Sequence, residues 1–174
     1  MNIIITGGCG FVGSSLCLYL KKNLKRSKIL SIDNLSKNYS VFNQKILKKN
    51  NIENKKINLG KFNSLKHVNF KADIIIDCSA EPAVEISKKK IVKVIESNFI
   101  STLNILEKNK KDKSKLMFIS SSRVYPITES YKKFQDYKKG KLIPTFTEQE
   151  NLKGAKTIYG FTKAASEELI EEFS

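Results

Sequence analysis

The chain has 174 residues, which is enough for one hydrophobic core and too few for two full domains. No segment approaches the ~20 apolar residues of a membrane span, and no basic stretch leads into an apolar one at the start, so we expect a cytoplasmic protein without a membrane partner. The formal net charge of +15 comes mostly from lysines spread along the chain without interleaved aromatic residues, which argues against a nucleic-acid partner.

The first predicted elements are an apolar strand over Asn2–Thr6, a glycine-rich turn and a helix over Ser14–Lys25. In the turn, Gly7 allows a tight bend, Gly10 allows close approach of a pyrophosphate, and Gly13 allows the helix to pack against the strand. The amides at the helix N-terminus carry partial positive charge that favours phosphate groups. The segment therefore predicts a dinucleotide-binding site.

An acidic residue ends the second predicted strand, Lys28–Asp33, 20 residues after Gly13. An acid at this place accepts hydrogen bonds from both hydroxyl groups of an adenosine ribose and repels a phosphate on the 2′ oxygen. Asp33 therefore predicts NAD, in preference to NADP, as the cofactor.

Strands and helices alternate along the rest of the chain. The strands are near-continuous apolar runs, as in parallel sheets covered by helices on both faces. The pattern predicts an α/β fold in one domain over 1–174: a doubly wound, mostly parallel, Rossmann-like sheet of five strands with helices on both faces. Further strands are expected at Lys55–Leu59, Ala72–Ser79 and Lys115–Ser120, and further helices at Val41–Lys49, Lys89–Lys108 and Tyr159–Phe173, with a short turn near Ser64–Val68.

One polar residue lies on the apolar stripe of the predicted helix Lys89–Lys108. Asn98 is in line with Ile95 and Thr102, so its amide faces the sheet and needs hydrogen-bond partners. Two compatible interpretations remain open. The asparagine either fixes the neighbouring strand loops or holds backbone near a cofactor.

Serines follow the fifth predicted strand, at the carboxyl end of the sheet, where α/β proteins bind ligands. Ser120, Ser121 and Ser122 can reach a substrate there, although such a run also forms ordinary turns. Tyr159 and Lys163 are four residues apart and share a helix face. An ammonium beside a phenol favours the phenolate, which makes a general base usable near neutral pH.

The cysteines and the single histidine do not predict a metal site. Cys9, Cys17 and Cys78 show neither a C-x-x-C pair nor metal-ligand spacing, and His67 has no partner cluster. We expect reduced structural thiols, a histidine at the surface or at a helix cap, and no bound metal.

Together these motifs resemble the extended short-chain dehydrogenase/reductase superfamily, in its NAD-dependent nucleotide-sugar epimerase/dehydratase branch. Within this branch the chain is most similar to the CDP-paratose (CDP-tyvelose) 2-epimerases. The matching segments cover essentially the whole chain: 6–13 (TGGCGFVG), 33–36 (DNLS), 72–80 (ADIIIDCSA), 98–106 (NFISTLNIL), 120–125 (SSSRVY) and 159–163 (YGFTK).

The resemblance implies a role for each motif. The glycine-rich turn would hold the pyrophosphate, the acid after the second strand the adenosine ribose, and the end of the fourth strand the nicotinamide side. The implied catalytic residues are Ser121, Tyr159 and Lys163. The implied cofactor-binding residues are Gly7, Gly10, Phe11, Val12, Gly13, Asp33, Asn34, Ser79, Ala80, Asn98, Tyr159 and Lys163.

The implied reaction is epimerisation of a nucleotide-sugar through transient oxidation to a keto sugar and return of the hydride to the other face. Tyr159 would be the base, with a CDP-sugar inverted at its second carbon as the favoured substrate. Dehydration is disfavoured, because Ser122 and Arg123 stand where dehydratases of the family carry an Asp-Glu pair. Lys61 stands where the family commonly has an aspartate that bonds adenine, which predicts weaker adenine recognition.

Chains of this family continue well beyond this length and add a substrate domain. The resemblance therefore implies an incomplete NAD-binding domain, from a truncated product or a split enzyme with a missing C-terminal half, and a homodimer is expected from relatives. Two alternatives stay open. One is another nucleotide-sugar oxidoreductase or dehydratase of the branch, and the other is a non-catalytic NAD-binding fragment.

Overall fold

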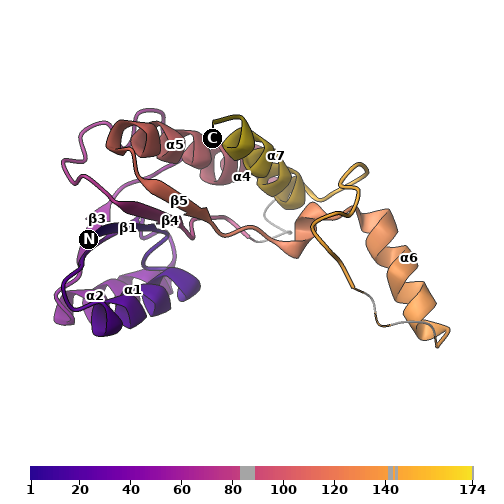
Figure 1. The fold of residues 1–174 in the computed structure, drawn as a ribbon, viewed down its shortest axis with the longest axis horizontal. Helices are drawn as coiled ribbons and strands as arrows, with labels where there is room; N and C mark the ends of the chain where they lie inside the picture. Colours follow the sequence, from indigo (N-terminus) through magenta and orange to yellow (C-terminus); the bar gives the residue numbers. More distant parts are fainter. Residues whose placement is uncertain (83–88, 141–142, 144, 174) are drawn as a thin grey trace.

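The computed structural model describes residues 1–82, 89–140, 143 and 145–173. Five strands form one parallel sheet in the order β3-β2-β1-β4-β5 (Figure 1). The chain begins at the central strand and builds first one half of the sheet and then the other, so its direction of winding reverses beside β1. The predicted doubly wound, Rossmann-like fold is confirmed. The strands are β1 (Asn2–Thr6), β2 (Lys28–Asp33), β3 (Glu53–Lys56), β4 (Ile74–Asp77) and β5 (Lys115–Phe118).

Helices cover both faces of the sheet. Figure 1 shows α1 and α2 on one face and α4, α5 and α7 on the other. The helix α6 extends away from the sheet, and none of its residues is buried. The helices are α1 (Phe11–Asn23), α2 (Asn38–Lys49), α4 (Ile91–Ile95), α5 (Ser101–Asp112), α6 (Ile127–Lys138) and α7 (Ile158–Phe173). No helix in the described part of the chain is long and apolar enough to cross a membrane.

Two apolar clusters flank the sheet, because side chains alternate along each strand. On β1, Ile3 and Ile5 belong to the cluster under α1 and α2, whereas Ile4 belongs to the opposite cluster under α5. All three side chains are almost completely buried, which explains the unbroken apolar run in this strand. The first cluster also contains Cys9, Cys17, Ile29, Leu47, Ile52 and Ile76, and the second contains Leu30, Ile32, Leu59, Leu65, Val68, Ala72, Ile75 and Ile105.

The outer strands are shorter than the sequence predicts, and the third is displaced. β3 covers Glu53–Lys56 instead of Lys55–Leu59, because its pairing with β2 ends where β2 ends, with Asp33 opposite Lys56. β4 and β5 stop together in the same way, with Asp77 opposite Phe118. Residues expected at the ends of these strands lie in loops at the carboxyl edge.

The predicted helix Lys89–Lys108 is divided by a π-helical turn, η1 (Glu96–Ile100), between α4 and α5. The Thr102 hydroxyl donates to the Asn98 carbonyl oxygen in this turn at 2.8 Å, and the hydroxyls of Ser101 and Ser166 lie 3.1 and 3.4 Å from the same oxygen. Such single turns are often found at functional sites. Apolar spacing alone does not reveal this turn.

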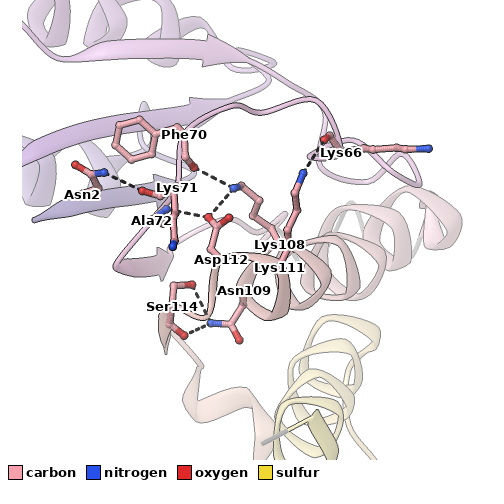
Figure 2. A network of polar contacts seen from close by, with 10 residues as sticks. All are labelled: Asn2, Lys66, Phe70, Lys71, Ala72, Lys108, Asn109, Lys111, Asp112 and Ser114. Atoms are coloured by element: carbon pink, nitrogen blue, oxygen red, sulfur yellow. Dashed lines mark hydrogen bonds and ion pairs between the residues drawn. The ribbon is translucent and has the colours of Figure 1, made fainter.

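The amino ends of the strands are fastened by a buried polar network, drawn in Figure 2. The Lys108 ammonium donates to an Asp112 carboxylate oxygen at 2.5 Å and to the Phe70 carbonyl at 2.9 Å. The same Asp112 oxygen accepts the backbone N–H of Ala72 at 2.8 Å. The C-terminal end of α5 is thereby joined to the segment that leads into β4.

The fifth strand pairs with a neighbour on one edge only in the described sheet. β5 is an edge strand in the described sheet, and Met117 and Ile119 are exposed at 55% and 39%. Leu116, which points to the opposite face, packs against the apolar cluster under α5. The described helices therefore cover this strand on one face better than on the other.

Candidate functional site

An open pocket of about 680 Å³, including solvent space, lies at the carboxyl ends of β1, β2 and β4. This is the position beside the reversal of winding where doubly wound proteins bind ligands. Six of the predicted cofactor residues line it: Gly7, Gly10, Asp33, Asn34, Ser79 and Ala80. Residues that were not predicted also line it, chiefly Lys37, Tyr39, Ser40, Asn58, Glu81, Lys93 and Ser97.

The glycine-rich turn has the geometry that its spacing predicts. Gly7 has a φ of 60°, a conformation that side chains disfavour. A Cβ on Gly13 would lie 2.2 Å from the Gly7 carbonyl oxygen, so α1 can approach β1 only with glycine there. The first backbone bond of α1 runs from Ser14 N–H to the Gly10 oxygen at 3.0 Å, which leaves the amides of Phe11, Val12 and Gly13 ahead of the regular ladder.

The Asp33 carboxylate is nearly buried at the pocket wall. One oxygen accepts the Leu35 N–H at 2.8 Å and the other accepts the Cys9 N–H at 3.1 Å. A carboxylate has about four lone-pair sites, so both oxygens keep acceptor capacity toward the pocket. Burial raises the pKa of Asp33 above its ordinary value of 3.8, and the two N–H donors oppose that shift.

Asn98 lies behind the pocket and not in its lining. Its side-chain oxygen accepts the Glu81 N–H at 2.7 Å, and its amide nitrogen donates to the Thr162 hydroxyl at 3.0 Å. The residue thus fixes the loop after β4 and ties it to α7. This agrees with the structural interpretation, and because that loop lines the pocket, the cofactor interpretation remains compatible.

Two buried polar atoms at the ends of β4 and β5 have no partner among the described residues. One Asp77 oxygen accepts from the Thr6 hydroxyl at 2.5 Å and from the Ser79 N–H and hydroxyl at 2.9 and 2.6 Å. The other Asp77 oxygen is unpaired, as is the Ser120 hydroxyl. Buried polar groups are normally paired, so this end of the sheet retains bonding capacity.

The start of α7 packs closely against the turn that contains Ser121. A Cβ on Gly160 would lie 2.1 Å from the Arg123 carbonyl oxygen, so the two backbones are in direct contact. Tyr159 precedes this glycine, and its side chain is largely buried. Ser121 caps the short 3₁₀ turn η2 (Ser122–Val124), where its hydroxyl oxygen accepts the Arg123 N–H at 3.1 Å.

Lys163 extends from α7 to the end of β5. Its ammonium donates to the Ile119 carbonyl at 2.9 Å and lies 4.1 Å from the centre of the Phe118 ring. Burial lowers the pKa of Lys163 from its ordinary value of 10.5, and the negative charge of Asp77 is the main opposing influence. The structure brings the segments of Ser121, Tyr159 and Lys163 together, but no hydrogen bond joins these side chains within the described residues.

The loop after β3, which contains Lys61, contributes to the pocket lining. Lys61 is not part of the pocket lining, whereas Asn58, Leu59 and Gly60 are. The side-chain oxygen of Asn58 accepts the Gly60 N–H at 3.1 Å, which orients the amide group in that loop. In this loop the polar side chain that lines the pocket is therefore that of Asn58 and not that of Lys61.

The cysteines have the properties of structural thiols. Cys9 and Cys17 are buried, and burial raises the pKa of their thiols to about 11 and about 12. Burial raises the pKa of Cys78 to about 11 as well. No cluster of cysteine, histidine or acidic residues in the described ranges has the form of a metal site.

Comparisons with known proteins point in one direction. A model of the NAD dependent epimerase/dehydratase family matches residues 3–174. A dTDP-D-glucose 4,6-dehydratase of Dictyostelium discoideum is 36% identical over 128 residues, which cover 71% of this chain and 30% of that protein. A UDP-N-acetyl-alpha-D-glucosaminuronate decarboxylase of Bacillus cytotoxicus is 30% identical over 159 residues, which cover 91% of this chain and 42% of that protein.

A solved UDP-galactose 4-epimerase has the same fold, with a TM-score of 0.74 and 27% identity over 99% of this chain and 51% of its own. The chain thus spans about half, or less, of the length of these proteins. Three different reactions are represented among them, so the shared part carries what those reactions have in common. With the family model matching nearly every residue, the chain belongs to the NAD dependent epimerase/dehydratase family.

Proposed function

We propose that the pocket binds NAD and that the chain is the cofactor-binding part of a nucleotide-sugar epimerase. The observation that carries the proposal is the Asp33 carboxylate, which lines the pocket with acceptor capacity left on both oxygens. The residues fit the cofactor. Asp33 and Asn34 would hold the adenosine ribose, and the amides of Phe11 to Gly13 at the start of α1 would hold the pyrophosphate.

The two ends of the cofactor follow from this placement. Asn58 would present its side-chain amide to adenine, in the part of the pocket where the loop after β3 lies. Ser79 and Ala80 would line the nicotinamide side, with Asn98 fixing their loop from behind. The contact between Asn98 and the Glu81 backbone supports this positioning role.

The catalytic groups would act on one sugar hydroxyl. Tyr159 would accept its proton as general base, and the Ser121 hydroxyl would donate a hydrogen bond to the same oxygen. Lys163, four residues after Tyr159 on α7, would favour the phenolate form of Tyr159 when its ammonium is protonated. When bound, NAD supplies the acceptor of a hydride. The same residues would return the proton after the keto sugar has turned over.

The substrate that we propose is a CDP-sugar inverted at its second carbon. The segment after Ser121 supports epimerisation in preference to dehydration, since Ser122 and Arg123 replace the acidic pair that dehydration would use, whereas the CDP-sugar rests on the resemblance of the sequence motifs. An arginine in place of an acid cannot serve as the general acid of a dehydration. A different oxidoreductase of nucleotide-sugars, or an NAD-binding chain without catalysis, would share the same pocket.

Binding and turnover are tested separately. NADH fluorescence during titration of the purified chain measures binding, with Asp33→Asn as the variant that should lose it. Proton NMR of a CDP-sugar and a UDP-sugar incubated with protein and NAD then follows turnover. Inversion of the CDP-sugar at its second carbon without net NADH supports the proposal. Inversion of the UDP-sugar alone, or NADH accumulation, contradicts the substrate assignment, and binding without turnover supports the non-catalytic alternative.

A further inference from the structure

A charged cluster on the pocket wall was not part of any predicted motif. Glu81 follows the loop after β4, and its side chain is only 4% exposed. Both of its carboxylate oxygens accept hydrogen bonds from the Lys37 ammonium, at 3.0 and 2.9 Å. The Lys93 ammonium lies 3.9 Å from one of these oxygens. All three residues line the same pocket as Asp33.

Lys37 is placed where a cation would affect the adenosine ribose. It is four residues after Asp33, it precedes the first residue of α2, and it shares the pocket wall with Asn34 and Ser36. In dinucleotide sites a basic residue near the ribose accommodates a 2′-phosphate. The N-terminus of α2 adds partial positive charge at the same place. By position alone, Lys37 would favour a phosphorylated ribose.

The Glu81 carboxylate, on the loop after β4, engages this cation directly within the pocket lining. Glu81 is fixed at its backbone by Asn98, so the carboxylate is positioned by a residue already buried in η1. A buried carboxylate interacts with an ammonium more strongly than an exposed one, because solvent screens it less. The Lys37 charge is thereby directed to Glu81 and away from a ligand.

We propose that Glu81 is a specificity-determining residue of the cofactor site, which excludes NADP by engaging the Lys37 ammonium that would otherwise pair with the 2′-phosphate. The inference rests on the proposed NAD site. It adds a second acid to the one that the sequence predicts. Asp33 repels the phosphate directly, whereas Glu81 withholds the positive charge that could compensate for this repulsion.

The side chains allow a clean perturbation. Glu81→Gln preserves the shape of the residue and its backbone contact with Asn98 while it removes the negative charge. The Lys37 side chain is 33% exposed, so it can turn toward a ligand once it is released. The cluster of Lys37, Lys93 and Glu81 then changes from one net positive charge to two.

The experiment compares dissociation constants for NADH and NADPH by fluorescence titration of the full chain. In Glu81→Gln we expect NADPH to bind about 10-fold more tightly relative to NADH than in the wild type. The double variant Lys37→Met/Glu81→Gln should lose this gain. The matched control is Glu107→Gln, which removes one negative charge from an exposed position on α5 and should leave the ratio unchanged.

The outcomes separate this inference from the proposed function. Failure of the wild type to bind NADH overturns the proposed function and this inference with it. NADH binding with an unchanged NADPH-to-NADH ratio in a folded Glu81→Gln protein overturns the inference alone, as does an equal gain in Glu107→Gln. Should Glu81→Gln fail to fold, Glu81→Asp keeps the charge but shortens its reach to Lys37, and about a threefold gain is expected.

Discussion

The two ends of the sheet treat buried charge in opposite ways. At the amino end, Lys108 and Asp112 neutralise each other, and the remaining bonds go to the carbonyl of Phe70 and the amide of Ala72 (Figure 2). At the carboxyl end, one oxygen of Asp77 and the hydroxyl of Ser120 have no partner in the described chain. The charged groups at the amino end are fully used in contacts within the fold, whereas polar groups at the carboxyl end can still form hydrogen bonds with a ligand.

We therefore assign the amino end of the sheet to the stability of the fold and the carboxyl end to ligand binding. Both ends contain nearly buried ionisable groups, so burial alone does not identify the site. What distinguishes the carboxyl end is the pairing. Asp33 accepts one hydrogen bond on each oxygen, and Lys163 donates to a carbonyl instead of a carboxylate. Incomplete pairing at this end agrees with a ligand site, but it is not confined to it, since the Asn54 amide nitrogen and the Ser64 hydroxyl are also buried without partners in the described residues.

The largest expected effect is at the amino end. Lys108→Met leaves Asp112 charged and buried without its partner, so the free energy of unfolding should fall by about 3–5 kcal/mol. Lys111→Met is the matched control, since Lys111 is exposed and its ammonium makes a long contact of 3.5 Å with the Lys66 carbonyl among the described residues. Urea denaturation followed by circular dichroism measures both. If Lys108→Met weakens NADH binding by the folded protein and leaves the free energy of unfolding nearly unchanged, the purely structural role of the amino end is contradicted.

The second largest expected change in unfolding free energy comes from the contact between α7 and the turn that contains Ser121. In an exposed helix, replacing glycine by alanine stabilises by about 1 kcal/mol. At Gly160 the sign should reverse, because the new Cβ would lie 2.1 Å from the Arg123 oxygen. We expect a loss of about 2 kcal/mol in unfolding free energy. Phe161→Ala, one residue on and exposed, is the control. A stabilised Gly160→Ala protein would show that this contact is not tight.

The arrangement of the elements was predictable, but their ends were not. Apolar runs alternating with helical segments predict the doubly wound, mostly parallel sheet, since a parallel sheet buried on both faces needs such runs, whereas the strand order comes from the structure. The bounds of β3 depend on where β2 stops, with Asp33 opposite Lys56, and no local pattern contains that information. No element was predicted for α6, although Ile127, Tyr131 and Phe134 recur along it at helical spacing, and these side chains are exposed in the described structure.

The site was predictable where its residues are close in sequence. The turn at Gly7 to Gly13 and the acid at Asp33 form one βαβ unit, and the pocket contains them. The pair Lys37–Glu81 joins residues 44 positions apart, so it arises only from the way that the fold brings two loops together. Asn98 was recognised by its place on a helix, whereas its partners Glu81 and Thr162 required the structure.

Binding at the carboxyl end should depend on pH through Asp33. Asp33→Asn replaces a charged acceptor, so the dissociation constant of NADH should rise about 10-fold near pH 7. Because burial raises the pKa of Asp33 above 3.8, wild-type affinity should fall as the pH drops through that raised value, whereas the variant should show a flatter profile. Fluorescence titrations at several pH values test this. Asp73→Asn, at the amino end, should behave like the wild type.

The same shift has a consequence for the protein without cofactor. A raised pKa means that the folded chain binds the Asp33 proton more tightly than the unfolded chain does. The contribution of this group to the free energy of unfolding is therefore present below pH 3.8 and is lost as the pH rises through its folded value. For NADH binding, an equal loss of affinity at low pH in the wild type and in Asp33→Asn would assign that pH dependence to a group other than Asp33.

The smallest expected effect concerns Lys163. Its contribution to the free energy of unfolding should rise with pH, whereas the contribution of Asp33 falls. Burial lowers the pKa of Lys163 below 10.5, so between its folded value and 10.5 the unfolded chain binds more protons than the folded one. The free energy of unfolding should then rise with pH over this interval, and Lys163→Met should remove that increase. Titration of the many other lysines cancels in the difference between the two proteins. We expect this difference in unfolding free energy to increase between pH 7 and pH 10 in urea denaturation. If this difference in unfolding free energy does not change with pH, the negative charge of Asp77 fully offsets the burial of Lys163. The Lys163 ammonium would then be compensated by a carboxylate, as the Lys108 ammonium is by Asp112.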